Sequence, residues 1–138
     1  QNLNMKNAII LASIIQRESI VIEEQTLIAS VFLNRINNNM KLDSDPTVQY
    51  AIGYDIETNT WWKNPLYLND LSIQSPYNTY QNIGLPPGAI CNPGLSAIKA
   101  VAQPEQSDFF YFRADCTNSG MHVFSATLQE HIAKECSN

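Results

Sequence analysis

The feature that most constrains the fold is an apolar stripe near the start of the chain that ends in a glutamate. The segment around 11–19, with the sequence LASIIQRES, predicts a helix, because apolar residues recur there at the three- and four-residue spacing of one buried face. Glu18 follows the last two stripe positions by four and three residues, so it continues the same face. The stripe consists of Ile10, Leu11, Ile14 and Ile15.

The position of Glu18 predicts a carboxyl group with a raised pKa. A charged carboxylate on an apolar face loses its hydration, and a helix C-terminus disfavours negative charge, so both effects favour the protonated form. A carboxyl group that stays protonated near neutral pH is suited to act as a general acid. The alternative is that Glu18 lies at the edge of the stripe and turns out into solvent.

Composition narrows the class of protein and its partners. A chain of 138 residues predicts one domain with one sizeable core. Charged residues make up only 15% of it, against an average of about 25%. The polar, weakly charged surface suits neutral ligands such as sugars, and it equally suits a plain solvated surface. The net charge of −5 and the lack of a basic run argue against nucleic acid as a partner.

Membrane and redox signals are weak in this sequence. No apolar run approaches the ~20 residues that span a bilayer, and the first residues lack the order of a signal peptide. The three cysteines allow either three free thiols or one disulfide, between Cys116 and Cys136, with Cys91 left free.

A second helix is predicted after a short break at 19–22. Glu23 and Glu24 place negative charge in its first turn, which suits the helix dipole, and we assign them that role ahead of a catalytic one. A second apolar stripe follows, and three asparagines at 37–39 end the helix. This stripe consists of Leu27, Ile28, Val31, Phe32 and Ile36.

A short third helix is predicted between Asp45 and Gly53. Asp45 followed by Pro46 is typical of an N-cap with proline in the first turn, and Gly53 is a common closing residue. Capping satisfies Asp45 as a structural residue. Alternatively, Asp45 serves as a second carboxylate near Glu18 or binds substrate.

The middle of the chain is predicted to be irregular. The segment 54–71 has no clear period, and its Trp61 and Trp62 either stack on a sugar ring or form a local hydrophobic cluster. Prolines make the loops at 75–80 and 84–88 rigid. The first loop presents side chains that both donate and accept hydrogen bonds, namely Tyr77, Asn78, Thr79 and Tyr80.

The last third predicts a helix, a β-hairpin and a closing helix. An asparagine–proline cap at 92–94 begins the helix, and Pro104 stops it. The segments 108–114 and 121–124 read as two strands. Ser125 or Thr127 caps the last helix, and Thr127 with Glu130 fits a capping box. The whole pattern predicts an α+β fold, mostly helical, with a loop-rich cleft.

His122 lies on the second predicted strand, on the same face as Phe124. A lone strand histidine is usually a hydrogen-bonded structural residue, and no second ligand stands at metal-binding spacing from it, so we predict no metal and no cofactor. His131 is expected on the exposed surface of the last helix.

Several segments, in order along the chain, resemble those of one protein family. They are 11–19 (LASIIQRES), 44–48 (SDPTV), 75–80 (SPYNTY), 84–88 (GLPPG), 90–94 (ICNPG), 110–115 (FYFRAD) and 122–125 (HVFS). The family is the endolytic murein transglycosylases, also called MltG or YceG-like proteins. Gln16, Ser19 and the turn at 116–120 depart from the family's pattern, but Glu18 matches its essential glutamate.

The resemblance implies a lysozyme-like catalytic domain that cuts inside peptidoglycan strands at the extracytoplasmic face of the bacterial cytoplasmic membrane. The family also carries a membrane anchor and a small LysM-like domain upstream, so we expect residues 1–138 to be a single catalytic domain without them. We expect a monomer. The family further suggests partners among the proteins of cell-wall synthesis.

The resemblance also implies a mechanism that uses one carboxyl group, whereas most glycosidases use two. Glu18 would protonate the oxygen between N-acetylmuramic acid (MurNAc) and N-acetylglucosamine (GlcNAc), and would then deprotonate the muramic acid 6-hydroxyl, whose attack leaves a 1,6-anhydro end. The residues expected to hold the sugars are Tyr77, Asn78, Tyr80 and His122, with Asp45 and Thr47 as further candidates.

Two other functions stay open. The first is a hydrolytic muramidase that uses Glu18 together with Asp45 or Asp43 across the cleft. The second is a non-catalytic peptidoglycan-binding module, although a glutamate is costly to keep on a buried stripe.

Overall fold

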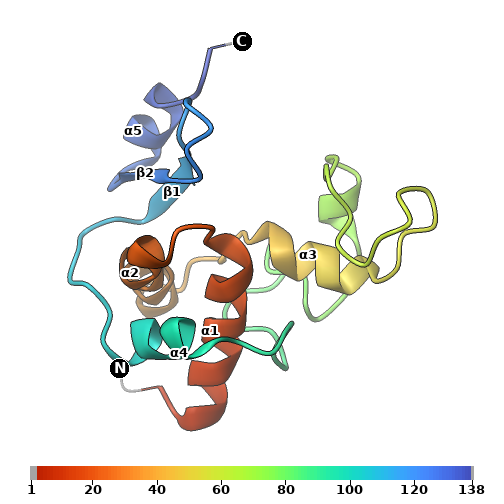
Figure 1. Ribbon diagram of the computed structural model, residues 1–138, viewed down its shortest axis with the longest axis horizontal. Coiled ribbons are helices and arrows are strands. Elements are labelled where there is room, and N and C mark those ends of the chain that lie inside the picture. The colour runs from red at the N-terminus through yellow and green to blue at the C-terminus, as the bar shows by residue number, and fades with distance from the viewer. Residues whose placement is uncertain (1–2, 138) are drawn as a thin grey trace.

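The computed structural model describes residues 3–137, which form an α+β fold in which helices predominate. Its elements are α1 (Met5–Glu18), η1 (Ile22–Glu24), α2 (Gln25–Asn37), α3 (Asp45–Ile52), η2 (Asp70–Ser72), α4 (Leu95–Ala102), β1 (Tyr111–Ala114), β2 (His122–Ser125) and α5 (Leu128–Ala133). Figure 1 shows α1 at the centre, α2 and α4 against it, α3 to one side, and the hairpin with α5 above. The predicted α+β class is confirmed.

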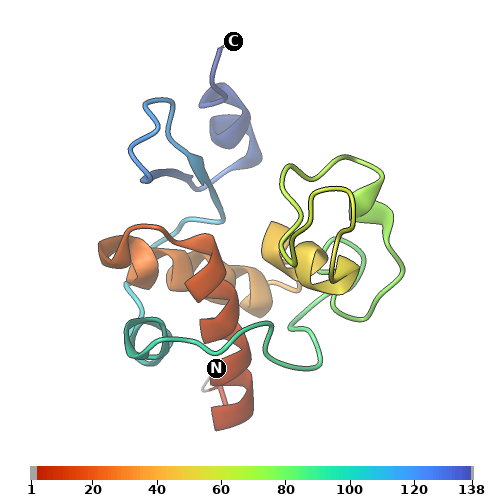
Figure 2. The ribbon, with the colours of Figure 1, turned by 45° about the vertical axis from the view of Figure 1, so that its right-hand side comes forward.

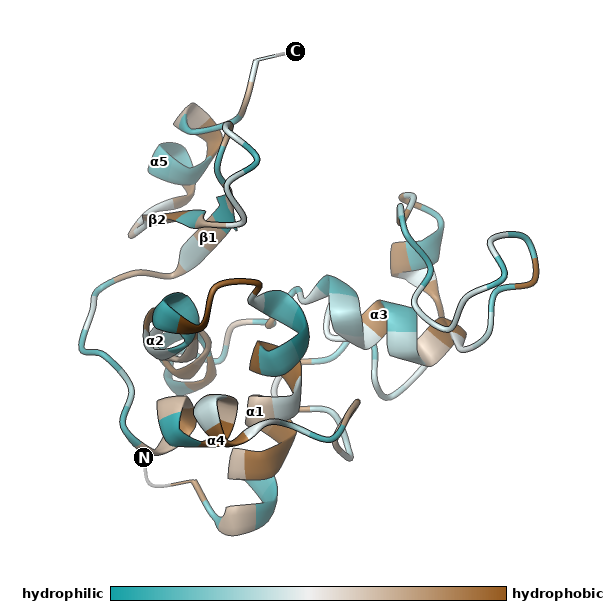
Figure 3. Cartoon of the chain, viewed as in Figure 1, coloured by the Kyte–Doolittle hydropathy of each residue, from teal (hydrophilic) through white to brown (hydrophobic). Residues whose placement is uncertain are grey.

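Helix α1 carries the predicted apolar stripe into the core. Ile10 is 3% exposed, and the other three stripe residues are fully buried, so this prediction is confirmed. Each such side chain contributes about 2 kcal/mol by leaving water. In Figure 3 the apolar residues of α1 lie where α2 and α4 approach it. The helix most clearly marked in the sequence is therefore the one around which the others pack.

The end of α1 falls where the sequence predicts it. Ser19 leaves the helix in an extended conformation, and both its backbone N–H and its hydroxyl donate to the carbonyl of Ile15, at 3.0 and 3.1 Å. The side-chain amide of Gln25 in turn donates to the Ser19 hydroxyl at 3.0 Å. These bonds satisfy the last turn of α1 and leave Glu18 as its final residue.

The segment 90–94 docks along α1 through polar contacts. The buried hydroxyl of Ser13 accepts the N–H of Ile90 at 3.0 Å, and the side-chain oxygen of Gln16 accepts the N–H of Gly94 at 2.9 Å. A Cβ at Gly94 would lie 3.0 Å from that Gln16 oxygen, so any other residue would force a shift. The backbone of Ile90 and Gly94 thus anchors this segment to α1, and Gly94 fits closely there.

Two predicted helix caps are wrong by one or two residues. Ser44 precedes α3 and Gly94 precedes α4, so neither Asp45 nor Asn92 occupies the N-cap. Asp45 is instead the first residue of α3, and its carboxylate accepts the hydroxyl of Tyr80 at 2.6 Å. The proline in each segment marks the start of a helix, but it does not mark which residue caps it.

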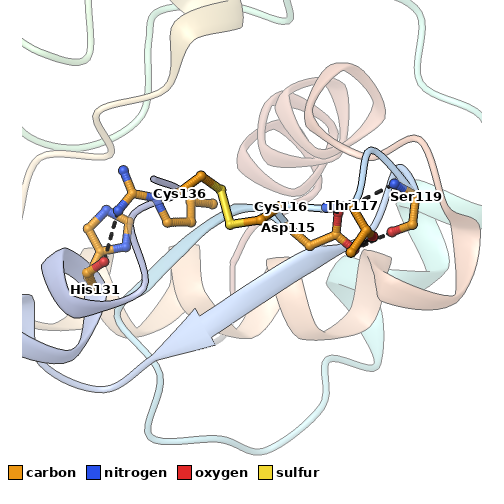
Figure 4. The surroundings of a disulfide bond; sticks show 7 residues. Asp115, Cys116, Thr117, Ser119, His131 and Cys136 are labelled. Atoms are coloured by element: carbon orange, nitrogen blue, oxygen red, sulfur yellow. Dashed lines mark hydrogen bonds between the residues drawn. A yellow bond between two sulfur atoms is a disulfide. The ribbon is translucent and has the colours of Figure 1, made fainter. Parts of the chain in front are cut away.

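The hairpin closes the fold at the C-terminal end. Strands β1 and β2 pair antiparallel, with Tyr111 opposite Ser125 and Ala114 opposite His122. Their connecting turn is held by Asp115, whose carboxylate accepts the N–H groups of the turn, as Figure 4 shows for Thr117 and Ser119. The two strands and α5 form one small layer above α2 (Figure 1).

A disulfide joins this hairpin turn to the end of the chain. Cys116 and Cys136 are bonded (Figure 4), and Cys91 is a free thiol, so of the two alternatives left by the sequence the disulfide is the correct one. Thr127 caps α5 by accepting the N–H of Glu130 at 3.2 Å, which confirms the predicted cap, whereas the Glu130 carboxylate accepts the N–H of Ala126, one residue before the N-cap, at 3.0 Å.

The two tryptophans of the irregular segment 54–71 separate in the structure. Trp62 packs against the core, and the Arg17 guanidinium lies 3.8 Å from its ring centre. Trp61 is 65% exposed and contacts Tyr54. No helix within residues 3–137 is long and apolar enough to cross a membrane.

Candidate active site

A polar pocket opens where the end of α1, the start of α3 and the hairpin meet. In Figure 2 the end of α1 lies between the hairpin with α5 and the start of α3. The pocket encloses about 370 Å³, within the range of about 300–1,000 Å³ that is typical of small-ligand sites. Its lining residues are Glu18, Phe32, Arg35, Leu42, Asp43, Asp45, Tyr80, Phe112, Arg113, Ala114, His122 and His131.

Glu18 is partly buried in this pocket and holds one close hydrogen bond. The Ser44 hydroxyl donates to its Oε1 at 2.6 Å. Burial raises the pKa of Glu18 to about 7 and is the largest effect; the Ser44 bond lowers it and the nearby Asp45 charge raises it. The direction agrees with the expectation from the apolar stripe. The carboxyl group is thus about half protonated at neutral pH.

Ser44 is itself held by two buried threonines. Its N–H donates to Thr79 Oγ1 at 3.0 Å, and its carbonyl accepts the Thr47 hydroxyl at 2.6 Å. The two threonine hydroxyls also bond to each other at 2.8 Å. Thr47 is fully buried and Thr79 is 1% exposed. The structure therefore places Thr47 beneath the pocket, where it positions Ser44 and through it Glu18.

Two aspartates line the pocket beside Glu18. Asp45 accepts the Tyr80 hydroxyl, and burial together with this carboxylate raises the pKa of Tyr80, which therefore stays protonated. Asp43 lies 3.6 Å from the Arg35 guanidinium, yet burial still raises the pKa of Asp43. Asp45 and Tyr80 are thus brought together at the pocket wall, as two of the residues proposed to hold sugars.

Tyr77 and Asn78 do not line the pocket. Asn78 is fully buried; its amide donates to the carbonyls of Leu71 and Ile73 at 3.0 and 2.9 Å, and its oxygen accepts the N–H of Tyr80 at 2.9 Å. Tyr77 packs against the core. The expected contact of these two side chains with sugar is not supported, because the Asn78 amide bonds to backbone groups of its own loop and the Tyr77 ring packs against the core.

His122 reaches the pocket from β2, and its partner is a residue that the sequence reasoning missed. Glu24 Oε1 accepts the backbone N–H of His122 at 2.9 Å, and Glu24 Oε2 lies 2.8 Å from the ring Nδ1. Glu24 is the N-cap residue of α2, but its side chain is buried and makes no helix-cap hydrogen bond. Its predicted place at the start of the helix is therefore confirmed, and its carboxylate has a second role that the sequence did not show, in binding His122.

Arg35 is a second missed residue. It is 8% exposed, and its guanidinium donates to the carbonyls of Phe110, Lys41 and Leu42 at 2.6, 3.0 and 3.1 Å. It follows Phe32 by three positions on the buried face of α2, which is the one signal in the sequence that could have found it.

His131 is a third residue that the sequence placed wrongly. The sequence predicts it on the surface, but it lines the pocket, and its ring stacks on Tyr111 with centres 5.3 Å apart. Burial and the nearby Arg113 charge lower its pKa, so its ring is neutral at neutral pH. Within residues 3–137, no group of three His, Cys, Asp or Glu side chains is arranged to hold a metal ion.

Comparison with known proteins identifies the family. Residues 1–136 match the model of the YceG-like family. The chain belongs to this family. The resemblance drawn from the seven short segments is thereby confirmed.

Relatives of this YceG-like chain carry one name. The chain is 43% identical over 121 residues to a Bacillus subtilis (strain 168) protein named endolytic murein transglycosylase. The match covers 88% of this chain and 31% of the relative. The chain is 37% identical over 130 residues to the Streptococcus pneumoniae serotype 2 (strain D39) protein of the same name, covering 94% of this chain and 23% of the relative. The chain thus spans less than a third of the length of these curated relatives.

A solved structure shares the fold. The crystal structure of a yceG-like protein from Listeria monocytogenes superposes with a TM-score of 0.84 at 41% sequence identity, and the match covers 96% of this chain and 40% of that one. The architecture described above is therefore that of an experimentally observed YceG-like protein.

Proposed function

We propose that this chain is the lysozyme-like catalytic domain of an endolytic lytic transglycosylase, which cuts the MurNAc-β-1,4-GlcNAc bond inside peptidoglycan strands. The observation that carries the proposal is Glu18, a carboxyl group with a pKa of about 7 in an open polar pocket. The name shared by the relatives supports the substrate class. Glu18 is the proposed catalytic residue.

In the first step Glu18 acts as a general acid. Its proton passes to the oxygen that links the two sugars, the bond from that oxygen to the anomeric carbon breaks, and GlcNAc leaves with a free hydroxyl. The Ser44 hydroxyl, 2.6 Å from Oε1, then donates to a carboxylate instead of a neutral acid. Such a bond becomes stronger as the charge forms.

In the second step the same group acts as a base. The Glu18 carboxylate takes the proton of the muramic acid 6-hydroxyl, and that oxygen bonds to the anomeric carbon to give the 1,6-anhydro end. No water is consumed, and Glu18 returns to its protonated form. A pKa near the working pH suits both directions of proton transfer.

The remaining pocket residues are proposed to hold the glycan. Tyr80 and Asp45, bonded to each other at one wall, and His122 at the hairpin wall offer donors and acceptors for sugar hydroxyls. The disulfide favours an oxidising, extracytoplasmic compartment, where peptidoglycan lies. We propose a monomeric domain of residues 1–138 that acts there, with proteins of cell-wall synthesis as its partners.

A hydrolytic muramidase is the second candidate, because Asp43 and Asp45 line the same pocket as Glu18. Such an enzyme would use a second carboxylate to activate water. Digestion of purified peptidoglycan in heavy-oxygen water separates the two reactions. The proposal predicts anhydro ends without label, whereas a hydrolase gives reducing ends that carry one heavy oxygen.

Two variants sharpen this experiment. Asp45→Asn removes one candidate second carboxylate while keeping an oxygen that accepts the Tyr80 hydroxyl. Asp43→Asn removes the other candidate while keeping an oxygen that can face the Arg35 guanidinium. Unlabelled anhydro products should persist in both, at a reduced rate. Labelled products that vanish in either variant would establish the hydrolase. If the wild-type chain gave no product at all, both enzymatic functions would be contradicted and the non-catalytic peptidoglycan-binding module would be favoured.

A further inference from the structure

The contact between Glu24 and His122 is the part of the pocket that the proposed reaction does not use. The two carboxylate oxygens of Glu24 bind two nitrogens of one residue, the backbone N–H at 2.9 Å and the ring Nδ1 at 2.8 Å. The side chains of His122 and Glu24 are only 11% and 8% exposed. A carboxylate with both oxygens directed at one histidine fixes the position and the orientation of its ring.

The chemistry of the pair also fixes which ring nitrogen carries the proton. A carboxylate only accepts hydrogen bonds, so Nδ1 must be the donor, and in the neutral ring Nε2 is then left with a lone pair. Among residues 3–137, the hydrogen bond of the His122 ring is the one that Nδ1 makes with Glu24. The edge-on contact between the His122 and Phe112 rings, whose centres are 5.3 Å apart, further limits rotation.

We infer that Glu24 holds His122 in the Nδ1–H tautomer so that Nε2 accepts a hydrogen bond from a sugar hydroxyl, at the hairpin wall of the pocket. Glu24 is therefore a positioning residue that acts through His122. The inference rests on the proposed function, because the ligand is the glycan of that proposal. A purely structural contact between Glu24 and His122 would not require a hydrogen-bond acceptor at Nε2, whereas this inference does.

The tautomer is tested directly by nitrogen–proton correlation spectra of the histidine ring, recorded where the ring is neutral. Glu24→Gln offers one oxygen and one NH₂ group; the oxygen accepts the His122 backbone N–H, and the NH₂ faces Nδ1. The ring proton should then move to Nε2. Glu23→Gln, the same change at the exposed neighbour, should leave the wild-type tautomer, and a wild-type ring already protonated at Nε2 would overturn the inference.

The acceptor is tested by binding of soluble glycan fragments to Glu18→Gln protein, in which turnover does not interfere. His122→Asn keeps a donor near the position of Nδ1 but has nothing at Nε2, so the dissociation constant should rise about 3- to 10-fold. Glu24→Gln should raise it similarly, and Glu23→Gln should not change it. His122→Gln, whose amide can reach the position of Nε2, should restore part of the affinity.

The outcomes separate this inference from the proposed function. If His122→Asn and Glu24→Gln left the affinity for glycan unchanged and lowered thermal stability, the pair would serve only to stabilise the hairpin. In the active protein the same variants should raise KM and leave kcat unchanged, since the bond is made in ground and transition states alike. Failure of the parent to bind any glycan would refute the proposed function and the ligand assigned here, whereas the spectra judge the tautomer independently.

Discussion

Replacing Glu18 with glutamine should make the protein more stable at high pH and leave its stability unchanged at low pH. Moving a pKa from its ordinary 4.5 to about 7 corresponds to about 3 kcal/mol, at 1.36 kcal/mol per pH unit. Because the folded-state pKa is raised, the contribution of protonated Glu18 is fully present below about pH 4.5 and is lost as the pH rises through about 7. The replacing glutamine does not titrate, and its side-chain oxygen can still accept the Ser44 hydroxyl.

Urea unfolding of wild type and Glu18→Gln across this pH range measures the effect, with tryptophan fluorescence as the signal. The difference between the two proteins cancels the titration of every other group that the change does not touch. It should be near zero at acid pH and should grow to about 3 kcal/mol in favour of Glu18→Gln by about pH 8. Glu23→Gln, at an exposed site, should show no such growth. Parallel stability curves for wild type and Glu18→Gln would refute the buried, proton-holding carboxyl group.

Three further outcomes follow from the structure. The ratio kcat/KM should fall as the pH rises above about 7, because the acid form of Glu18 is lost; a profile flat to about pH 9 would contradict its role. Thr79→Val removes the acceptor of the Ser44 N–H, so it should lower the free energy of unfolding in urea by about 1–3 kcal/mol and should also lower activity. Full activity in this variant would show that the network does not position Glu18. Cys116→Ser, which frees Cys136, should lower the free energy of unfolding by about 3 kcal/mol without changing the type of product. An unchanged Tm would refute the stabilising role of the disulfide.

The central helix and its glutamate could be predicted because their signals are local. The spacing of the stripe places Ile14, Ile15 and Glu18 on one face whatever the rest of the chain does. Burial of that face in the core is also why the direction of the Glu18 pKa shift was predictable. The cap at Thr127 is equally local, since it joins residues three apart.

The sequence named Asp45, Tyr80 and His122, which line the pocket, but the contacts that hold the pocket walls together could not be predicted, because they join distant residues. Glu24 and His122 are 98 positions apart, and each alone has an ordinary local explanation. Thr47 and Asn78 show a different limit. Hydroxyl and amide groups serve equally well to bind a sugar or to satisfy buried backbone, and only the three-dimensional arrangement shows that both are committed to the backbone.

The measurement that tests the central claim most directly is mass spectrometry of the products released from purified peptidoglycan by wild type and by Glu18→Gln. The account predicts 1,6-anhydro muropeptides from wild type and none from Glu18→Gln, whose fold is verified by its circular dichroism. Anhydro products from a folded Glu18→Gln protein at a rate near that of wild type would contradict the assignment of Glu18 as the acid and base.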